Sequence, residues 1–402
     1  MRTAVLVILS VFLMDILLTG FVLPNDLFGL VGTERLSRIY SPLYHHDLAP
    51  NREIEGARWG TSRYHFSTNS LGFKDRSTRT VPLTSDRPRI LFMGDSFTEG
   101  NSFDFDRSFP GQVEALLADR QVEVLNAAVS SYSPAIYYRK IKYLLEDKHL
   151  EFDAVAVFID ISDIDDEARG VRLDENDNVV SRGAGPAEEY IEGLTLRVRS
   201  LLKRYSSIYR LASALNRQRK SNLTHVNSCL DAISPKSDHT GLDAGFFRAA
   251  LDNPRSQWTW NETEYENWGK RGLDLAAINM TQLKGLLDAH GIPLIVAVYP
   301  WPEQIFERET NSRQSRFWRR WAAGNGADFL DLFPAFMKEA DPLATYTEYF
   351  VPCDVHWNAT GHRLVAERFV TLYRSLDGQR IPREGPTHTD KNLPKADAVP
   401  TL

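Results

Sequence analysis

The chain has 402 residues, of which 43% are hydrophobic, 11% aromatic and 25% charged, and these proportions are typical of a folded globular protein. The formal net charge is -6 and no run of five or more basic residues occurs, so a nucleic acid is not an expected partner. The only two cysteines, Cys229 and Cys353, lie far apart, which excludes a structural zinc site of the Cys-x-x-Cys kind.

The first predicted element is an almost wholly apolar segment from Thr3 to Leu23. About 20 helical residues at ~1.5 Å each can cross a hydrocarbon layer of about 30 Å, so we expect a membrane helix. A cleaved signal peptide has an apolar core of about 7–15 residues followed by small residues, whereas Pro24 and Asn25 follow here. We therefore expect residues 1–24 to form a signal anchor that is not cleaved. Arg2 precedes the span, so the bulk of the chain is expected on the exported, periplasmic or extracellular side.

Asp15 interrupts this apolar segment. An ionisable group near the centre of a membrane helix costs about 2.5–3.5 kcal/mol on insertion scales. Two interpretations stay open: a very apolar helix tolerates one acid, or Asp15 contacts another membrane protein. Export would also place the cysteines in an oxidising compartment, where both a Cys229–Cys353 disulfide and two separate buried thiols are possible.

Residues 25–88 are rich in Arg, Tyr and Pro and show only short strand patterns, so we expect an irregular connector packed on the main domain. Within this connector, His45, His46 and Asp47 form a polar run that is expected at the surface.

From residue 89 onward, continuous apolar runs alternate with helical patterns, which is typical of a parallel sheet covered by helices on both faces. The expected strands are Arg89–Gly94, Val122–Asn126, Asp153–Asp160, Ile292–Pro300 and Asp328–Leu332. The expected helices are Phe109–Asp119, Pro134–Lys148, Asn267–His290, Asn311–Gly324 and Ala359–Leu376.

About 130 residues separate the third and fourth predicted strands, far more than a crossover needs. We expect an insertion at about residues 165–266 that caps the strand ends, with a basic helical stretch at Leu194–Lys220 and an aromatic run that includes Trp258, Trp260 and Trp268. The domain would then cover residues 89–378, and the polar, proline-rich residues 379–402 would form a flexible tail.

Three residues at opposite ends of this domain point to hydrolytic chemistry. Ser96 directly follows the first predicted strand, at the sheet edge where parallel strands bind ligands. Asp354 and His356 directly precede the last predicted helix, and alternate residues of an extended loop point the same way. Asp354 could therefore orient His356 while His356 takes the proton of Ser96, which is the arrangement of a Ser-His-Asp triad.

A different use of the same loop is a metal site built from Asp354, His356 and His362, as in a metal-dependent phosphoesterase. His362 falls in the first turn of the predicted helix, where we expect it to face solvent or to pack locally.

Taken together, the two motifs resemble the SGNH (GDSL-type) hydrolase superfamily. Gly94-Asp95-Ser96 is similar to its nucleophile block and Asp354-Val355-His356 to its terminal block, and the resemblance spans residues 89–376 outside the insertion. It implies a three-layer α/β/α sandwich with a five-stranded, flavodoxin-like parallel sheet. It also implies esterase, lipase or carbohydrate acyl-esterase activity without a cofactor or metal.

The middle blocks differ from the family pattern at two positions. Ser131 stands where the family has a glycine that donates its N–H to the oxyanion, and Ser131 still offers a backbone N–H. Ser162 stands where the family has a side-chain amide donor. Its hydroxyl would either donate to the oxyanion or cap the acidic turn that begins with Asp163. Trp301 follows the fourth strand and is expected either to stack on a sugar ring or to pack in the interior.

The sequence therefore predicts a membrane-anchored, exported serine esterase that removes small acyl groups, most often acetyl, from an envelope or extracellular carbohydrate. The acyl group, the polymer and the choice between hydrolysis and transfer stay open. Two alternatives are a catalytically weak binding, scaffold or acyl-transfer subunit of a polysaccharide-modifying membrane assembly, and a metal-dependent phosphoesterase.

Overall fold

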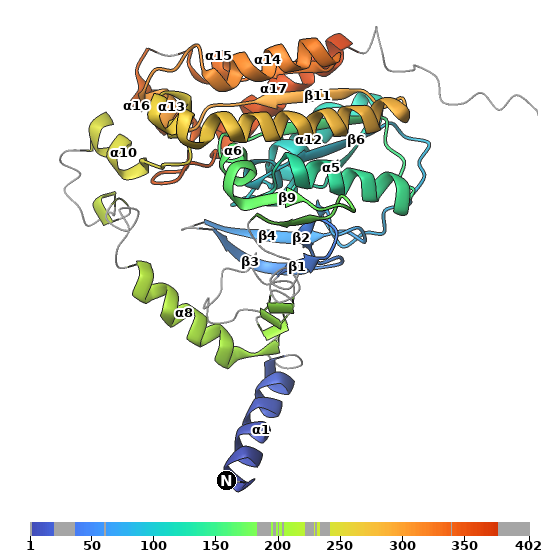
Figure 1. Ribbon diagram of the computed structural model, residues 1–402, viewed down its shortest axis with the longest axis vertical. Coiled ribbons are helices and arrows are strands. Elements are labelled where there is room, and N and C mark those ends of the chain that lie inside the picture. The colour runs from blue at the N-terminus through green and yellow to red at the C-terminus, as the bar shows by residue number, and fades with distance from the viewer. Residues whose placement is uncertain are drawn as a thin grey trace, which may run out of the picture.

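One sheet organises the molecule, and helices cover both of its faces (Figure 1). The computed structural model describes residues 2–19, 37–59, 62–182, 205–221, 242–338 and 340–376, with short pieces at 194–195, 198–199, 201–202, 229 and 231–233. The sheet has eight strands in the order β12-β11-β8-β6-β7-β5-β4-β3. The predicted tail at residues 379–402 and parts of the predicted insertion between residues 183 and 241 lie outside the described residues.

Five parallel strands form the centre of this sheet and confirm the predicted parallel core. Numbered along the chain, they lie in the order 2-1-3-4-5 of a flavodoxin-like fold. Every residue of β6, β8 and β11 is buried, which explains the continuous apolar runs in the sequence. The five strands are β6 (Arg89–Gly94), β7 (Glu123–Asn126), β8 (Ala154–Ile159), β11 (Leu294–Val298) and β12 (Asp328–Asp331).

Two layers of helices sandwich the sheet. Helix α12 packs against α5 and α14 on one face, and α17 packs against α4 on the other. These helices agree with the predicted ones to within a few residues, except that α4 and α5 end earlier. A single 3-10 turn follows α4 and a single π turn follows α5. Their bounds are α4 (Phe109–Leu116), α5 (Pro134–Lys142), α12 (Lys270–Ala289), α14 (Arg313–Asn325) and α17 (Ala359–Leu376).

Short helices and one small ribbon fill the connections. The short helices are α3 (Ser96–Glu99), α6 (Asp163–Asp165), α10 (Ala244–Leu251), α11 (Glu262–Glu264), α13 (Pro302–Phe306), α15 (Phe333–Phe336) and α16 (Pro342–Tyr349). Single turns of 3-10 or π helix cover Phe105–Arg107, Ala118–Arg120, Tyr143–Asp147, Asp166–Gly170, Gln257–Thr259 and Tyr265–Gly269. Strands β9 (Val171–Leu173) and β10 (Val179–Ser181) pair antiparallel.

The expectation of a sheet with only five parallel strands was wrong, because the segment before residue 89 extends the sheet. Strands β3 (Glu53–Trp59), β4 (Ser62–Thr68) and β5 (Lys74–Asp75) run antiparallel, and β5 joins β7 through Lys74 and Asn126. An exposed β7 edge would present unpaired N–H and C=O groups, and these strands cover it. The polar residues of a half-exposed hairpin hid this role in the sequence.

The expectation that His45, His46 and Asp47 lie at the surface was wrong for Asp47, whereas His45 and His46 are partly exposed. They form β2 (His45–Leu48), which pairs with β1 (Arg38–Ser41). Asp47 is buried and accepts a hydrogen bond from Lys140 Nζ at 2.7 Å. A buried charge needs a partner, and the lysine that supplies it lies on α5, far away in the sequence.

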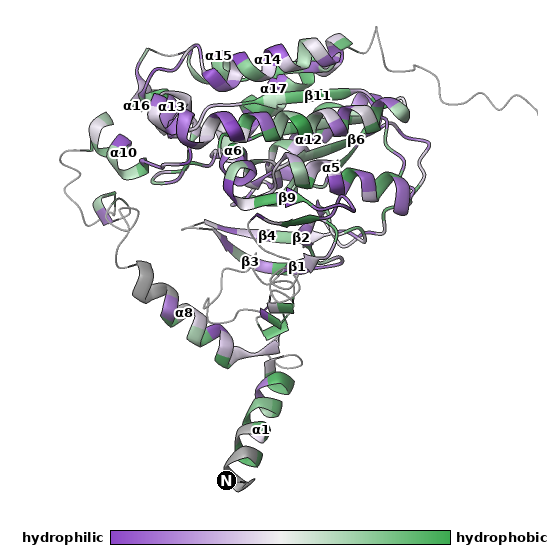
Figure 2. Ribbon diagram, viewed as in Figure 1, coloured by the Kyte–Doolittle hydropathy of each residue, from purple (hydrophilic) through white to green (hydrophobic). Residues whose placement is uncertain are grey.

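The apolar amino-terminal segment forms helix α1 (Arg2–Leu17), which projects from the body (Figure 1) and is mostly hydrophobic (Figure 2). Across the parts of the chain that the structure describes, no helix is both long and apolar enough to span a membrane. The carboxylate of Asp15 accepts hydrogen bonds from the Ser207 N–H (3.0 Å) and the Ser206 hydroxyl (2.5 Å), at the start of helix α8 (Ser207–Ser221). Asp15 therefore has partners within its own chain.

The described end of the insertion packs on the loop that follows β8. The Trp258 indole N–H donates to the Ile161 carbonyl at 3.0 Å, and the guanidinium of Arg255 donates to the Ser162 carbonyl and to Asp166. Trp258 and Trp268 are buried, so interior packing accounts for these two aromatic residues.

Candidate active site

Ser96 lies at the carboxyl end of β6, as the first residue of α3. Asp95 caps this short helix, since its Oδ1 accepts the Phe97 N–H at 3.0 Å. Gly94 is required by a close approach, because a Cβ there would lie 2.3 Å from Thr98 Oγ1 and 3.0 Å from the Phe158 carbonyl. This tight turn presents the Ser96 side chain at the sheet edge.

The structure brings Ser96, His356 and Asp354 together across 260 positions of the sequence. The Ser96 Oγ lies 2.8 Å from His356 Nε2, and His356 Nδ1 lies 2.6 Å from Asp354 Oδ1. Asp354 also accepts the backbone N–H of His356 at 3.1 Å, which holds the loop closed around the carboxylate. The three side chains are therefore connected in the order that a hydrolytic triad requires.

The pair of His356 and Asp354 shifts the pKa of both groups. Burial by itself lowers the pKa of His356, but the negative charge and hydrogen bond of Asp354 outweigh it, and the net pKa of His356 is raised. Burial raises the pKa of Asp354, but the neighbouring His356 outweighs it, and the net pKa of Asp354 is lowered. Asp354 is therefore ionised wherever His356 works as a base.

Trp59 is a site residue that the sequence analysis missed. It ends β3, and its indole N–H donates to Asp354 Oδ2 at 3.0 Å. Its ring also meets the edge of the His356 ring, with centroids 5.0 Å apart, while Phe97 stacks on His356 at 4.6 Å. A tryptophan in a polar hairpin carries no local signal of this role, because only the pairing of β3 with the main sheet brings it to the triad.

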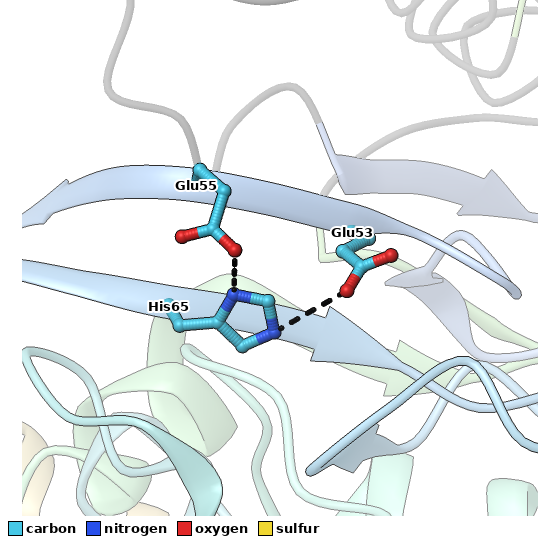
Figure 3. Close-up of side chains that lie close together, drawn as sticks. All are labelled: Glu53, Glu55 and His65. Carbon is cyan, nitrogen blue, oxygen red and sulfur yellow. Dashed lines mark hydrogen bonds and ion pairs between the residues drawn. The ribbon is translucent and has the colours of Figure 1, made fainter.

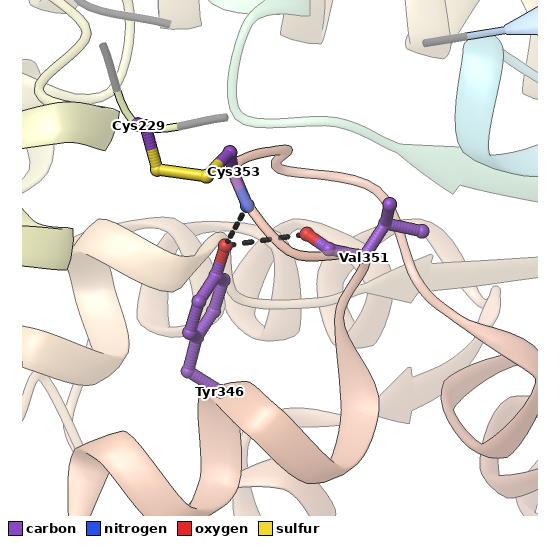
Figure 4. Close-up of a disulfide and its surroundings, with 4 residues drawn as sticks. All are labelled: Cys229, Tyr346, Val351 and Cys353. Carbon is purple, nitrogen blue, oxygen red and sulfur yellow. Dashed lines mark hydrogen bonds between the residues drawn. A yellow bond between two sulfur atoms is a disulfide. The ribbon is translucent and has the colours of Figure 1, made fainter. Parts of the chain in front are cut away.

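A disulfide ties the triad loop to the insertion (Figure 4). Cys353, directly before Asp354, is bonded to Cys229, which decides between the two states that the sequence left open. The Tyr346 hydroxyl accepts the Cys353 N–H at 2.7 Å and donates to the Val351 carbonyl at 3.2 Å. Cys353 has a φ of 60°, an uncommon conformation for a residue other than glycine, and these contacts hold it there.

Ser131 lies in the loop after β7 and is exposed. Its φ of 65° lies in the left-handed region that favours glycine, which fits the glycine of the family pattern at this position. Among the described residues, its N–H has no backbone acceptor. The N–H of Ser96 lies in the first helical turn, where no intrahelical acceptor exists. Both N–H groups are therefore suited to donate hydrogen bonds to an oxyanion.

Helix α3 itself holds the loop after β7 that carries Ser131. Glu99, three residues after the nucleophile, is fully buried, and its Oε2 accepts both the N–H (2.6 Å) and the hydroxyl (2.8 Å) of Ser130. From the β1–β2 ribbon, the Nε2–H of His46 donates to the Ser130 carbonyl at 2.9 Å. Burial lowers the pKa of His46 well below its usual value, so this ring stays neutral.

The GDSL-like Lipase/Acylhydrolase family model matches residues 92–364 of this chain. The chain belongs to this family. It is therefore a GDSL-type hydrolase of ester bonds, which confirms the resemblance seen in the sequence.

Solved structures of GDSL-type and related esterases resemble the chain at low identity. A putative lipolytic protein of the G-D-S-L family from Desulfitobacterium hafniense is 11% identical, covers 71% of this chain and 99% of its own, and has a TM-score of 0.36. An acetyl xylan esterase is 12% identical, with 71% and 98% coverage and a TM-score of 0.37. A lipase/acylhydrolase from Enterococcus faecalis is 13% identical, with 74% and 99% coverage and a TM-score of 0.33. No curated protein matches the chain.

In this acylhydrolase, Ser162 follows β8 and is buried, but its hydroxyl does not cap α6. Its backbone N–H donates instead to Asp160 Oδ1 at 2.7 Å. The capping role weighed for Ser162 is therefore absent, and the oxyanion role stays a prediction.

Asp163 is fully buried and belongs to a group of three carboxylates, with Asp95 and Asp160, whose oxygens lie within 4.8 Å of one another. Asp163 therefore does not lie in a solvated acidic turn. Burial and the neighbouring carboxylates raise the pKa of Asp95 to about 7 and the pKa of Asp163 well above its usual value. Asp163 accepts a hydrogen bond from the Tyr137 hydroxyl at 2.7 Å, which helps to hold the loop after β8.

Trp301 is only 4% exposed, and its indole N–H donates to Asp160 Oδ2 at 2.6 Å. The structure therefore places Trp301 in the packed interior, beside Phe97, rather than where a sugar ring could stack on it.

Two groups of side chains in the described ranges could hold a metal ion. One is the buried carboxylate group of Asp95, Asp160 and Asp163. The other lies on the β3–β4 hairpin, where His65 sits between Glu55 (2.8 Å) and Glu53 (3.8 Å) (Figure 3). Both ring nitrogens of His65 thus face carboxylates in a partly exposed group of three side chains.

The metal site considered for the triad loop does not form. His362 is 1% exposed and its Nδ1 accepts the Phe109 N–H at 3.2 Å, so it neither faces solvent nor joins Asp354 and His356 in a group of ligands. Burial lowers the pKa of His362 to about 3, which keeps this ring neutral.

Proposed function

We propose that this acylhydrolase cleaves carboxylic esters through a covalent acyl-enzyme formed on Ser96. The observation that carries the proposal is the pair of hydrogen bonds from Ser96 Oγ to His356 Nε2 (2.8 Å) and from His356 Nδ1 to Asp354 (2.6 Å). His356 takes the Ser96 proton while Oγ attacks the ester carbonyl, and then gives that proton to the leaving alcohol. In the second half of the reaction His356 takes a proton from water, which attacks the acyl carbon; the bond to Ser96 Oγ breaks, the acid leaves and His356 returns the proton to Ser96.

The N–H groups of Ser96 and Ser131 would bind the oxyanion of each tetrahedral intermediate. Donors at fixed positions stabilise the developing charge without having to reorganise. The contacts of Ser130 with Glu99 and His46 support this role, because they fix the loop that carries Ser131. The Ser162 hydroxyl would be the third donor.

The proposed substrates are small acyl esters, above all acetyl esters, on an envelope or extracellular carbohydrate. The ring of Trp59 is only partly buried beside His356, where a sugar carrying the ester could lie against it. No cofactor is needed for this chemistry.

We further propose that α1 attaches the enzyme to a membrane and that the catalytic domain is exported. The large apolar side chains of α1 are exposed, among them Phe12, Leu13 and Met14, whereas Asp15 is buried. The Cys229–Cys353 disulfide supports export, since such bonds persist mainly in oxidising compartments.

Covalent labelling tests the proposed chemistry. A fluorophosphonate should modify Ser96 of the full-length enzyme and leave Ser96→Ala unlabelled, and mass spectrometry of peptides locates the adduct. Acetyl release from acetylated glycans, compared between the parent and Ser96→Ala, then tests the substrate class. A parent enzyme that is not labelled would overturn the acyl-enzyme, and would favour the alternative of a binding or scaffold subunit. Labelling without acetyl release would overturn only the substrate.

A further inference from the structure

Helix α8 has its polar and apolar sides reversed relative to a helix packed on a water-soluble protein. Ile208, Leu211 and Leu215 recur at the spacing of one helical face, and their exposed fractions are 51%, 46% and 54%. Arg210, on the opposite side of the helix, is only 4% exposed. A helix that buries an arginine and exposes leucines leaves its apolar face uncovered in water, which marks an interaction surface.

The same reversal occurs in α1, and the two helices are joined. Asp15 and Thr19 are buried, whereas the leucines of α1 are exposed. The Asp15 carboxylate accepts the N–H groups of Ser207 (3.0 Å) and Ile208 (3.3 Å), so it caps the first turn of α8. Helix α8 therefore starts at the body-side end of α1, where α1 would leave a membrane (Figure 1).

The charge around α8 identifies what would cover its apolar face. Residues 194–221 contain eight Lys or Arg and no Asp or Glu, in a chain whose net charge is -6. Leu194, Val198 and Leu201, just before α8, are also exposed. Exposed apolar side chains within a strongly basic segment match a bilayer surface that carries anionic head groups.

We propose that α8 is an interfacial helix that lies on an anionic lipid surface, with Ile208, Leu211 and Leu215 in the boundary between head groups and acyl chains. The inference builds on the proposed membrane attachment through α1. Attachment at a second point beside α1 would limit how the catalytic domain rotates, and would keep the active site at a fixed height above the membrane.

A depth measurement on the full chain tests this placement. A nitroxide is attached at Leu215→Cys, and the protein is reconstituted into vesicles of phosphatidylcholine with about one third phosphatidylglycerol. The label should be accessible to oxygen, which dissolves in acyl chains, and shielded from a water-soluble nickel chelate. Ile278→Cys on α12 is the matched control, because Ile278 is also exposed (56%) but lies on the body of the molecule. Its label should be accessible to the nickel chelate.

Substitutions on α8 test whether its apolar face is what shields the label from nickel. Because Leu215 carries the label, it cannot be replaced as well, so the double variant Ile208→Ser/Leu211→Ser is labelled at Leu215→Cys. We expect nickel accessibility to rise severalfold, and replacement of another exposed pair, Leu83→Ser/Leu116→Ser, should leave it unchanged. When only Leu215 is replaced, by the labelled cysteine, vesicles of phosphatidylcholine alone should give the same rise in nickel accessibility, since they lack the anionic charge.

The possible outcomes separate this inference from the proposed anchor. A chain that floats with the vesicles while the Leu215 label stays open to nickel keeps the anchor and overturns the inference for α8. A chain that does not float overturns both. A label shielded from oxygen and nickel alike would show that protein, either a second copy or another partner, covers α8, and this also overturns the inference.

Discussion

Trp59 donates its indole N–H to Asp354 across 295 positions of the sequence, and so links an amino-terminal hairpin to the proposed catalytic triad. The two oxygens of the Asp354 carboxylate have different partners: Oδ1 contacts His356 and Oδ2 accepts from Trp59. Asp354 is therefore fixed from two sides, and the segment before residue 89 contributes to the candidate active site.

Trp59→Phe keeps most of the ring and removes the donor. Hydrogen bonds to charged groups contribute about 1.5–3 kcal/mol, so we expect kcat/KM to fall by roughly 10- to 150-fold. The acid limb of the pH profile should also move to higher pH, because a carboxylate that loses a donor acts more strongly on His356. Trp268→Phe is the control, since its N–H donates to Glu264 instead. Equal profiles for the parent and Trp59→Phe would contradict the positioning role.

Ser96→Ala and His356→Ala should each lower kcat by about 10⁴-fold or more, because the two side chains act as one unit. For the same reason the double variant should be little worse than either single one. Melting temperatures check that the variants fold. Residual activity within about tenfold of the parent in either single variant would refute the assigned roles.

The pH dependence follows from the raised pKa of His356. Protonated His356 cannot accept the Ser96 proton, so activity is lost as the pH falls through the pKa of His356. Since this pKa is raised, the midpoint of the acid limb of kcat/KM should lie above the ordinary value of about 6.5. Asp354→Asn should move the midpoint to lower pH, because burial then acts without the opposing charge, and should reduce kcat by about 10⁴-fold. A midpoint below 6 in the parent enzyme would argue against His356 as the base.

Ser162→Ala tests the third oxyanion donor. A well-placed donor is worth about 10²–10³ in kcat, and a short, rotatable hydroxyl should be worth less, so we expect a loss of roughly 3- to 30-fold. The melting temperature should not change, because the hydroxyl makes no cap. Ser162→Asn should retain or raise activity if the amide fits. A drop in melting temperature with unchanged kcat would instead assign Ser162 a structural role.

Removal of the disulfide should affect both stability and catalysis. Cys229→Ala/Cys353→Ala releases a link across 124 residues, and the loss of a native disulfide costs about 2–5 kcal/mol. We expect a lower melting temperature, and also a lower kcat, because Cys353 adjoins Asp354. Treatment of the parent enzyme with a reductant should reproduce both effects. A variant with a lower melting temperature and full kcat would show that Tyr346 holds the triad loop without the disulfide.

Local patterns determined a large part of this protein. Strands β6 and β8 are buried on both faces, so their apolar runs could be recognised without any knowledge of their neighbours. Ser96 directly follows a strand, and Asp354 and His356 are two residues apart, so the triad could be predicted from short motifs and from the rule that parallel strands bind ligands at their carboxyl ends.

Tertiary structure alone decided what surrounds that triad. Trp59, Glu99 and His46 reach the site through strand pairing and buried hydrogen bonds, and such contacts leave no periodicity in the sequence. Asp47 looked like a surface residue because its partner, Lys140, lies 93 positions away. Burial of a polar group depends on whether a distant partner can satisfy it, and only the folded chain brings the two together.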